Sequence, residues 1–112
     1  MNLSFWKHDI KKGIYLLIGD SLNTQTKKRE YLYRPLYKCD YEFFTKEKDK
    51  FLDGKFIPIT TYKELLFAIE EMPFEKDDLL NELLDDLKKS VKKGKEEKYR
   101  LNFKDVKINC IL

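Results

Sequence analysis

The chain has 112 residues, which fits one compact domain, and 42% of them are hydrophobic, which excludes a wholly disordered protein. Its 23 basic and 20 acidic side chains leave a net charge of +3, an excess too small to mark a nucleic-acid-binding protein. Two cysteines, Cys39 and Cys110, are too few for a disulfide framework or a structural zinc site, so we expect both thiols to be reduced.

The first predicted element is a buried strand over residues 14–18, where the sequence is the apolar run IYLLI. Polar turn residues follow over 20–29. Residues 30–38 alternate as a strand does, with tyrosines on one face and other side chains on the opposite face: Tyr31, Tyr33 and Tyr37 against Leu32, Arg34 and Leu36. Pro35 cannot donate a ladder hydrogen bond, so this strand lies at an edge, ends there or bulges. Residues 41–44 predict a third strand, which completes an antiparallel meander.

The next segment predicts a turn over residues 51–54, a short extended piece over 56–59 and then a helix. Thr61 begins the helix and Glu64 follows at the spacing of a capping box, in which each side chain satisfies a free backbone N–H. Pro73 ends the helix. Its apolar stripe is formed by Leu65, Leu66, Ile69 and Met72.

The clearest helical pattern covers residues 77–93, where apolar residues recur at helical spacing: Leu79, Leu80, Leu83, Leu84, Leu87 and Val91. Acidic residues fill its first turns and lysines its last, which complements the helix dipole, and Gly94 stands where a C-terminal cap belongs. We interpret its acidic residues as a solvated helix face: Asp77, Asp78, Asp85 and Asp86.

The chain ends in a segment, residues 98–112, that predicts a last strand. Its apolar residues alternate in two phases: Tyr99, Leu101 and Phe103, then Val106, Ile108, Cys110 and Leu112. The change of phase indicates a bulge or a tight hairpin. Because apolar residues continue to the last position, we expect this strand to dock in the sheet.

These elements predict a single α+β domain over residues 1–112. A small, strongly bent antiparallel sheet of four or five strands occupies residues 5–59, and a pair of helices over 61–93 packs on it or beside it. The strand over 98–112 rejoins the sheet. An exposed strand edge can pair with a second copy of the chain, so both a monomer and a homodimer are compatible with the pattern.

The sequence lacks the residues of a recognisable catalytic or metal site. His8 is the single histidine, and its neighbours in FWKHDIKK indicate a surface or turn residue. Cys39 follows Lys38, but a nucleophile also needs a base, which only His8 could supply. No phosphate-binding or zinc-protease motif is present. We therefore expect no cofactor, no metal and no enzyme activity, with a small hydrolase using His8 or Cys39 as a minor alternative.

The aromatic run YLYRPLYKCDYEFF, residues 31–44, has two interpretations. In the first, the rings fill the core of a small barrel. In the second, the tyrosines stay exposed and form a stacking surface, with Arg34 beside them as a clamp for a carboxylate, a phosphate or a stacked base. The candidate ligand- or partner-binding residues are Tyr31, Tyr33, Arg34, Tyr37 and Tyr41.

Three short segments carry a resemblance: WKHDIKKGIY at 6–15, TQT at 24–26 and YRPLY at 33–37. They resemble a family of small bacterial domains of unknown function with an SH3-like β-barrel, over residues 6–58. The matching positions are Lys12, Gly13, Tyr15, Thr24, Thr26, Tyr33, Arg34, Leu36 and Tyr37. The family has a tryptophan and an Arg-Pro-Leu step after this strand, where the present chain has Phe43-Phe44 and Thr45-Lys46-Glu47. The resemblance implies a fold and no activity.

The favoured function is a non-catalytic binding or inhibitory protein that binds a protein partner or a small ligand stoichiometrically, for example a phage-encoded anti-defence protein or a toxin-immunity protein. The alternative is a small nucleic-acid-binding module that uses the aromatic strand and the lysines at 88–98. No N-terminal apolar run resembles a signal peptide, and no stretch approaches the ~20 apolar residues that cross a bilayer. We expect a cytoplasmic protein of a bacterium, or of the host cell if a phage encodes it, with no membrane partner.

Overall fold

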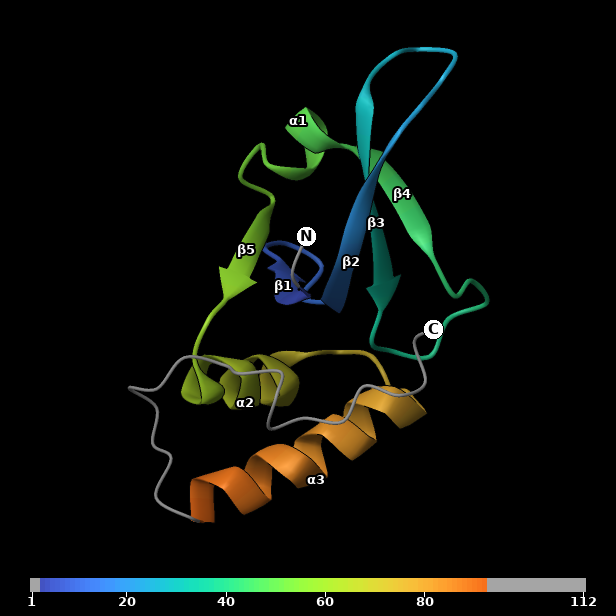
Figure 1. Ribbon diagram of the computed structural model, residues 1–112. Coiled ribbons are helices and arrows are strands. Elements are labelled where there is room, and N and C mark those ends of the chain that lie inside the picture. Colours follow the sequence, from blue (N-terminus) through green and yellow to red (C-terminus); the bar gives the residue numbers. More distant parts are fainter. Residues whose placement is uncertain (1–2, 93–112) are drawn as a thin grey trace.

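The computed structural model of the chain describes residues 3–92, with side chains as far as residue 86. Within this part, five antiparallel strands form one open sheet, and two of three helices lie together at one end of it (Figure 1). The strands are β1 (Ser4–His8), β2 (Ile14–Leu22), β3 (Arg29–Pro35), β4 (Phe44–Glu47) and β5 (Phe56–Ile59). The helices are α1 (Lys48–Phe51), α2 (Tyr62–Glu71) and α3 (Asp78–Lys92). The predicted α+β class is confirmed. The strand predicted over 98–112, which contains Cys110, and the helix cap predicted at Gly94 lie outside the described residues.

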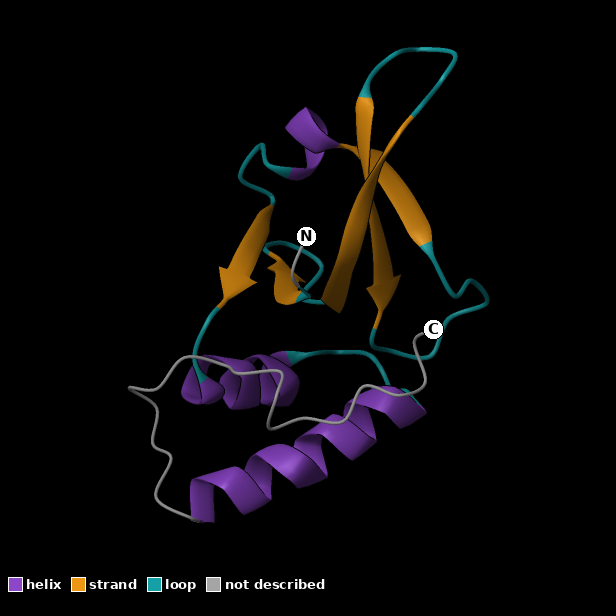
Figure 2. Ribbon diagram, viewed as in Figure 1, coloured by secondary structure: helices purple, strands orange, loops and turns teal. Residues whose placement is uncertain are grey.

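The strands lie in the order β4-β3-β2-β1-β5, so the meander from β1 to β4 is followed by a return of the chain to the other edge. There β5 pairs antiparallel with β1, with Phe5 opposite Ile59 and His8 opposite Phe56. The sheet is strongly bent, and β4 and β5 are its two free edges (Figure 2). The hairpin of β2 and β3 projects away from α2 and α3, and its turn is the part of the described chain farthest from those helices.

The strand boundaries differ from the sequence prediction in three places. β1 was not predicted, because SFWKH is short and only Phe5 in it is fully buried. β2 runs on to Leu22 since its polar end pairs with the start of β3 in the projecting hairpin. β4 begins at Phe44, not near residue 41, because Phe44 is the residue that pairs with Tyr33 and the preceding residues form an exposed loop. β3 ends at Pro35, one of the three outcomes expected for that proline.

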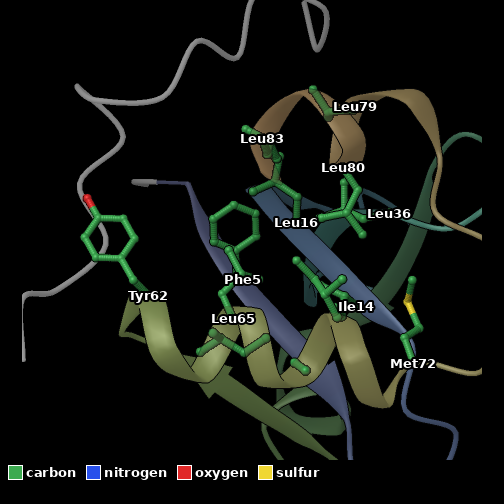
Figure 3. Packing of buried hydrophobic residues seen from close by; sticks show 13 residues of the cluster. Phe5, Ile14, Leu16, Leu36, Tyr62, Leu65, Met72, Leu79, Leu80 and Leu83 are labelled. Carbon is green, nitrogen blue, oxygen red and sulfur yellow. The ribbon is translucent and has the colours of Figure 1, made fainter. Parts of the chain in front are cut away.

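One face of the sheet packs against α2 and α3 and forms the larger core (Figure 3). Its sheet side chains are Phe5, Ile14, Leu16, Leu36 and Ile59, and its helix side chains include Leu65, Ile69, Met72, Leu80 and Leu83. Burial of such side chains is the main term that holds helices to a sheet. The predicted apolar stripe of α2 faces this core, although Leu66 is only half-buried, and so does the α3 stripe as far as Leu84. Leu87 and Val91 of the predicted α3 stripe lie outside the described side chains.

The starts of α2 and α3 are capped by side chains, as the sequence predicted for α2. The Thr61 hydroxyl accepts the N–H of Glu64 at 3.1 Å. The Glu64 carboxylate accepts the N–H of Thr60 at 2.9 Å, and not that of Thr61, so the reciprocal half of the capping box is displaced by one residue. In α3 the capping residue is Asp77, whose carboxylate accepts the N–H of Leu80 at 2.9 Å.

The other face of the sheet is filled by aromatic rings inside the bend. The second core comprises Tyr15, Leu17, Tyr31, Tyr33, Phe51 and Phe56. Phe51 comes from α1 and stacks on Phe56 of β5, with ring centroids 4.3 Å apart and planes at 9°. The bend of the sheet and α1 thus cover the tyrosine face of β3. On the opposite face of β3, Leu32 and Arg34 are only half-buried.

Candidate functional site

Two of the five predicted binding residues lie in the aromatic core. Tyr31 and Tyr33 are 7% and 6% exposed, and each ring contacts Phe51 edge-on at 5.3 Å. Burial raises the pKa of Tyr33 above its ordinary value. Neither ring presents a face to solvent, so the condition for a stacking surface over this part of β3 is not met. Tyr31 and Tyr33 are therefore core residues of the bent sheet.

The other three predicted residues, Arg34, Tyr37 and Tyr41, line one pocket of about 220 Å³. The pocket lies where the end of β3, the loop toward β4 and the start of α3 meet. Its complete lining is Arg34, Pro35, Tyr37, Lys38, Cys39, Tyr41, Glu42, Asp77 and Asp78. We call it the Arg34 pocket.

Backbone hydrogen bonds bring the two sides of the Arg34 pocket together. After Pro35, the N–H of Leu36 still bonds to the carbonyl of Ile14 at 2.9 Å. The chain then runs beside the segment that leads into α3: the Lys38 N–H donates to the carbonyl of Glu75 at 2.8 Å, and Tyr37 forms an isolated bridge with Lys76. This pairing places the start of α3 against the end of β3.

An ion pair joins the two elements beneath the pocket. Arg34 Nη2 lies 3.0 Å from Asp77 Oδ2 in an ion pair, while Asp77 Oδ1 caps α3. The two side chains are only 23% and 14% exposed, so the ion pair is largely shielded from solvent. The Nη1 atom of Arg34 is buried and has no hydrogen-bond partner among residues 3–92. Arg34 therefore joins α3 to the sheet, and its expected role as a ligand clamp stays a prediction.

Tyr37 forms one wall of the Arg34 pocket and is held on two sides. Its hydroxyl lies 2.8 Å from the hydroxyl of Tyr15, and its ring stacks on Phe74 with centroids 4.6 Å apart. Burial and the hydrogen bond to Tyr37 raise the pKa of Tyr15 well above its ordinary value, so the Tyr15 hydroxyl keeps its proton. Gly13 leaves room for this ring, because a Cβ there would lie 2.8 Å from Tyr37 Cε1.

Tyr41 forms the opposite rim and is 67% exposed. It leans toward Phe44, with ring centroids 6.0 Å apart, and the neighbouring Phe43 is also exposed. Two acidic side chains at this rim, Glu42 and Asp78, are exposed and form no ion pair within the described part of the chain.

The sequence did not predict the acidic side of the pocket. The interpretation of Asp77 as part of a solvated helix face was wrong. Its carboxylate is largely buried, pairs with Arg34 and accepts the N–H of Leu80. The signal that could have found it is its position directly before the apolar pattern of α3, where a capping residue belongs. Phe74 was also missed; it follows Pro73 in the connection between the helices.

His8 is the last residue of β1, directly before the predicted turn. Its Nδ1 atom accepts the N–H groups of Lys11 at 3.1 Å and Ile10 at 3.3 Å and so closes the turn between β1 and β2. Cys39 is exposed and lines the Arg34 pocket, whereas His8 does not, so the two are not brought together. Among residues 3–92, no group of three or more His, Cys, Asp or Glu side chains is placed to hold a metal ion.

Comparison of the chain with protein-family models, with curated proteins and with solved structures finds no match. The resemblance to SH3-like domains therefore stays a prediction from the residues that carry it, and the function is argued from the geometry of the Arg34 pocket. No helix within residues 3–92 has both the length and the apolar character that a membrane crossing requires.

Proposed function

We propose that this protein is a non-catalytic binding protein that engages a protein partner stoichiometrically through the Arg34 pocket. The observation that supports it is the exposure of Tyr41 at the rim of a pocket whose opposite wall, Tyr37, is fixed. Exposed tyrosine beside a small concavity is the composition of binding hot spots, because the ring offers contact area at a low entropic cost. An inhibitor of the anti-defence or toxin-immunity kind is one form of such a protein.

The size of the Arg34 pocket favours a protein side chain over a cofactor. Its volume of about 220 Å³ lies below the roughly 300–1,000 Å³ of sites that enclose a drug-sized ligand. The flanking aromatic residues Phe43 and Phe74 are partly exposed, which extends the contact surface beyond the pocket itself. A partner would insert one side chain and cover the surrounding rings.

Preorganisation of the pocket supports the same function. The Tyr15–Tyr37 hydrogen bond and the Arg34–Asp77 ion pair fix one wall and the floor. Rigid walls reduce the conformational entropy that is lost on binding, so more of the contact energy appears as affinity.

We also propose that the sheet belongs to the SH3-like class of small barrels. Two features support this: β5 returns to pair with β1, and rings from both ends of the bent sheet meet inside it, with Tyr33 of β3 and Phe56 of β5 at 5.7 Å. The edges β4 and β5 remain unpaired with each other, so the barrel is open on that side.

Affinity capture tests the proposed function. The full chain is immobilised and exposed to a lysate of the cells that encode it, and the wild type is compared with Tyr41→Ala and Phe67→Ala. Phe67 is the matched control, since it is a similarly exposed aromatic residue on α2, outside the Arg34 pocket. We expect one stoichiometric protein that Tyr41→Ala loses and Phe67→Ala keeps. Equal capture by all three, or no captured protein, would contradict the proposal.

A second candidate function, nucleic-acid binding, is favoured by a cluster of lysines around His8. After burial, the charges of Lys11, Lys46 and Lys55 lower the pKa of His8, so positive charge from a turn, β4 and the approach to β5 converges there. Lys46 Nζ lies 5.1 Å above the Phe56 ring. The lysines at 88–98, which the sequence predicted for this function, lie outside the described side chains. Nucleic-acid binding predicts that the affinity for a labelled single-stranded oligonucleotide falls steeply with salt and is weaker in Lys46→Ala.

A further inference from the structure

We infer that the group which enters the Arg34 pocket is a cationic side chain, lysine or arginine, of the partner protein. This inference rests on the proposed function, because it names the chemistry of the same site. The charge inventory of the pocket carries it, and that inventory opposes the carboxylate, phosphate and base ligands expected from the arginine in the sequence.

Negative charge exceeds positive charge in the pocket lining: Glu42, Asp77 and Asp78 against Arg34 and Lys38. Both cationic side chains are already engaged. Arg34 forms an ion pair with Asp77, and Lys38 forms one with the exposed Glu75, each at a distance of 3.0 Å. Glu42 and Asp78 form no ion pair among the described residues. Glu75 is the main cause that raises the pKa of Lys38, and the charge of Asp78 is the smallest.

An anionic group would have to compete with Asp77 and Glu75 for the two cationic side chains of the Arg34 pocket. Nη2 of Arg34 is paired with Asp77, and Nη1, although it has no hydrogen-bond partner among residues 3–92, is buried from solvent. The same anion would be repelled by Glu42 and Asp78. Like charges that approach across an interface are strongly unfavourable, so acidic peptides and phosphates are rejected.

A cationic group meets two kinds of favourable partner in the pocket lining. The rings of Tyr37 and Tyr41 line the pocket, and aromatic rings attract ammonium and guanidinium groups. Glu42 and Asp78 supply opposite charge, and both are exposed at the rim where the charged end of a side chain would pass. The volume accepts one side chain, which favours a residue of a protein over a long free polyamine.

Titration of the full ¹⁵N-labelled chain, followed by amide chemical shifts, tests the inference. The probes are the capped tripeptides Gly-Arg-Gly, Gly-Lys-Gly and Gly-Glu-Gly, with spermidine as the free polyamine. We expect saturable shifts at residues 34–42 and 77–78 with at least one cationic tripeptide and none with Gly-Glu-Gly. The double variant Glu42→Gln with Asp78→Asn should weaken this binding about threefold or more, whereas Glu70→Gln on α2 should leave it unchanged.

Four results would overturn the inference: tighter binding of Gly-Glu-Gly, cation binding that the double variant does not weaken, a response to spermidine alone, and no saturable shift with either cationic tripeptide. The lysate capture separates these failures from failure of the proposed function. If the wild type captures a stoichiometric partner that Tyr41→Ala does not, the pocket binds a protein but by another chemistry. If the two capture the same proteins, the proposed function itself fails.

Discussion

Arg34 and Asp77 join the end of β3 to the start of α3 through one 3.0 Å contact, and the same Asp77 caps the helix. One carboxylate therefore pairs with a largely buried guanidinium and accepts a free N–H of the first helical turn. The stability of the fold and the shape of the Arg34 pocket depend on the same contact, because both side chains line the pocket.

Replacing Asp77 should separate these two roles. Asp77→Ala removes the cap and leaves Arg34 without its partner, so we expect the free energy of unfolding to fall by about 2–3 kcal/mol. Asp77→Asn keeps an oxygen that can cap the helix and removes only the charge, so its unfolding free energy should fall clearly less than that of Asp77→Ala. Urea denaturation measures both variants. Equal losses would show that the cap contributes nothing.

Gly13 and Gly19 form a matched pair of glycines for a packing test. In Gly13→Ala the new methyl group would lie 2.8 Å from Tyr37 Cε1 and 3.1 Å from the Tyr15 hydroxyl, so the wall of the pocket must shift. We expect a loss of about 1–3 kcal/mol in unfolding free energy. Gly19→Ala meets nothing within 4 Å and should change stability by at most about 1 kcal/mol in either direction. Similar losses in both variants would contradict the close approach at Gly13.

The hydrogen bond between Tyr15 and Tyr37 is suited to a double-mutant cycle. Tyr37→Phe leaves the Tyr15 hydroxyl in a buried place without this partner, which should cost about 1–2 kcal/mol. Changing both tyrosines to phenylalanine removes the donor and the acceptor together. The double variant should therefore lose less unfolding free energy than the sum of the losses in the two single variants. Additive losses, measured by urea denaturation, would show that the two hydroxyls do not interact.

His8 predicts a loss of stability in mild acid. Burial, followed by Lys11, Lys46 and Lys55, lowers its pKa in the folded state below the ordinary 6.5, and Nδ1 already accepts two N–H groups. The unfolded chain therefore binds the proton more readily than the folded chain. The stabilising contribution is complete above about pH 6.5 and is lost as the pH falls through the lower folded pKa.

The variant His8→Asn isolates this effect. An asparagine oxygen can accept the same N–H groups but does not titrate, so the variant should lack the decline that the wild type shows as the pH falls from 6.5 to the acid side. Urea midpoints measured for both proteins across this range give the comparison. Parallel curves would mean that His8 does not contribute to the acid sensitivity.

The fold was predictable where local signals decide it. The apolar run of β2, Thr61 and Pro73 at the ends of α2, and the periodicity of α3 each fix an element within a short segment. β1 and the start of β4 were missed or displaced because pairing decides them: SFWKH becomes a strand between β2 and β5, and Phe44 begins β4 opposite Tyr33.

The site was predictable only in part, for the same reason. Arg34, Tyr37 and Tyr41 stand close together in the sequence, but Tyr31 and Tyr33 belong to the opposite face of β3, and the bend that buries them is a tertiary feature. Asp77 reaches Arg34 only through the pairing of the segments around Tyr37 and Lys76. No pattern within either segment encodes that contact.

The most direct test of the binding function is native mass spectrometry of the chain after capture from lysate, at low and at high salt. We predict one protein partner in a fixed ratio that persists at moderate salt and is absent with Tyr41→Ala, since truncating a central tyrosine removes about 2 kcal/mol or more of binding energy. A chain that carries only nucleic acid and releases it in salt, or a partner that Tyr41→Ala retains, would contradict the account.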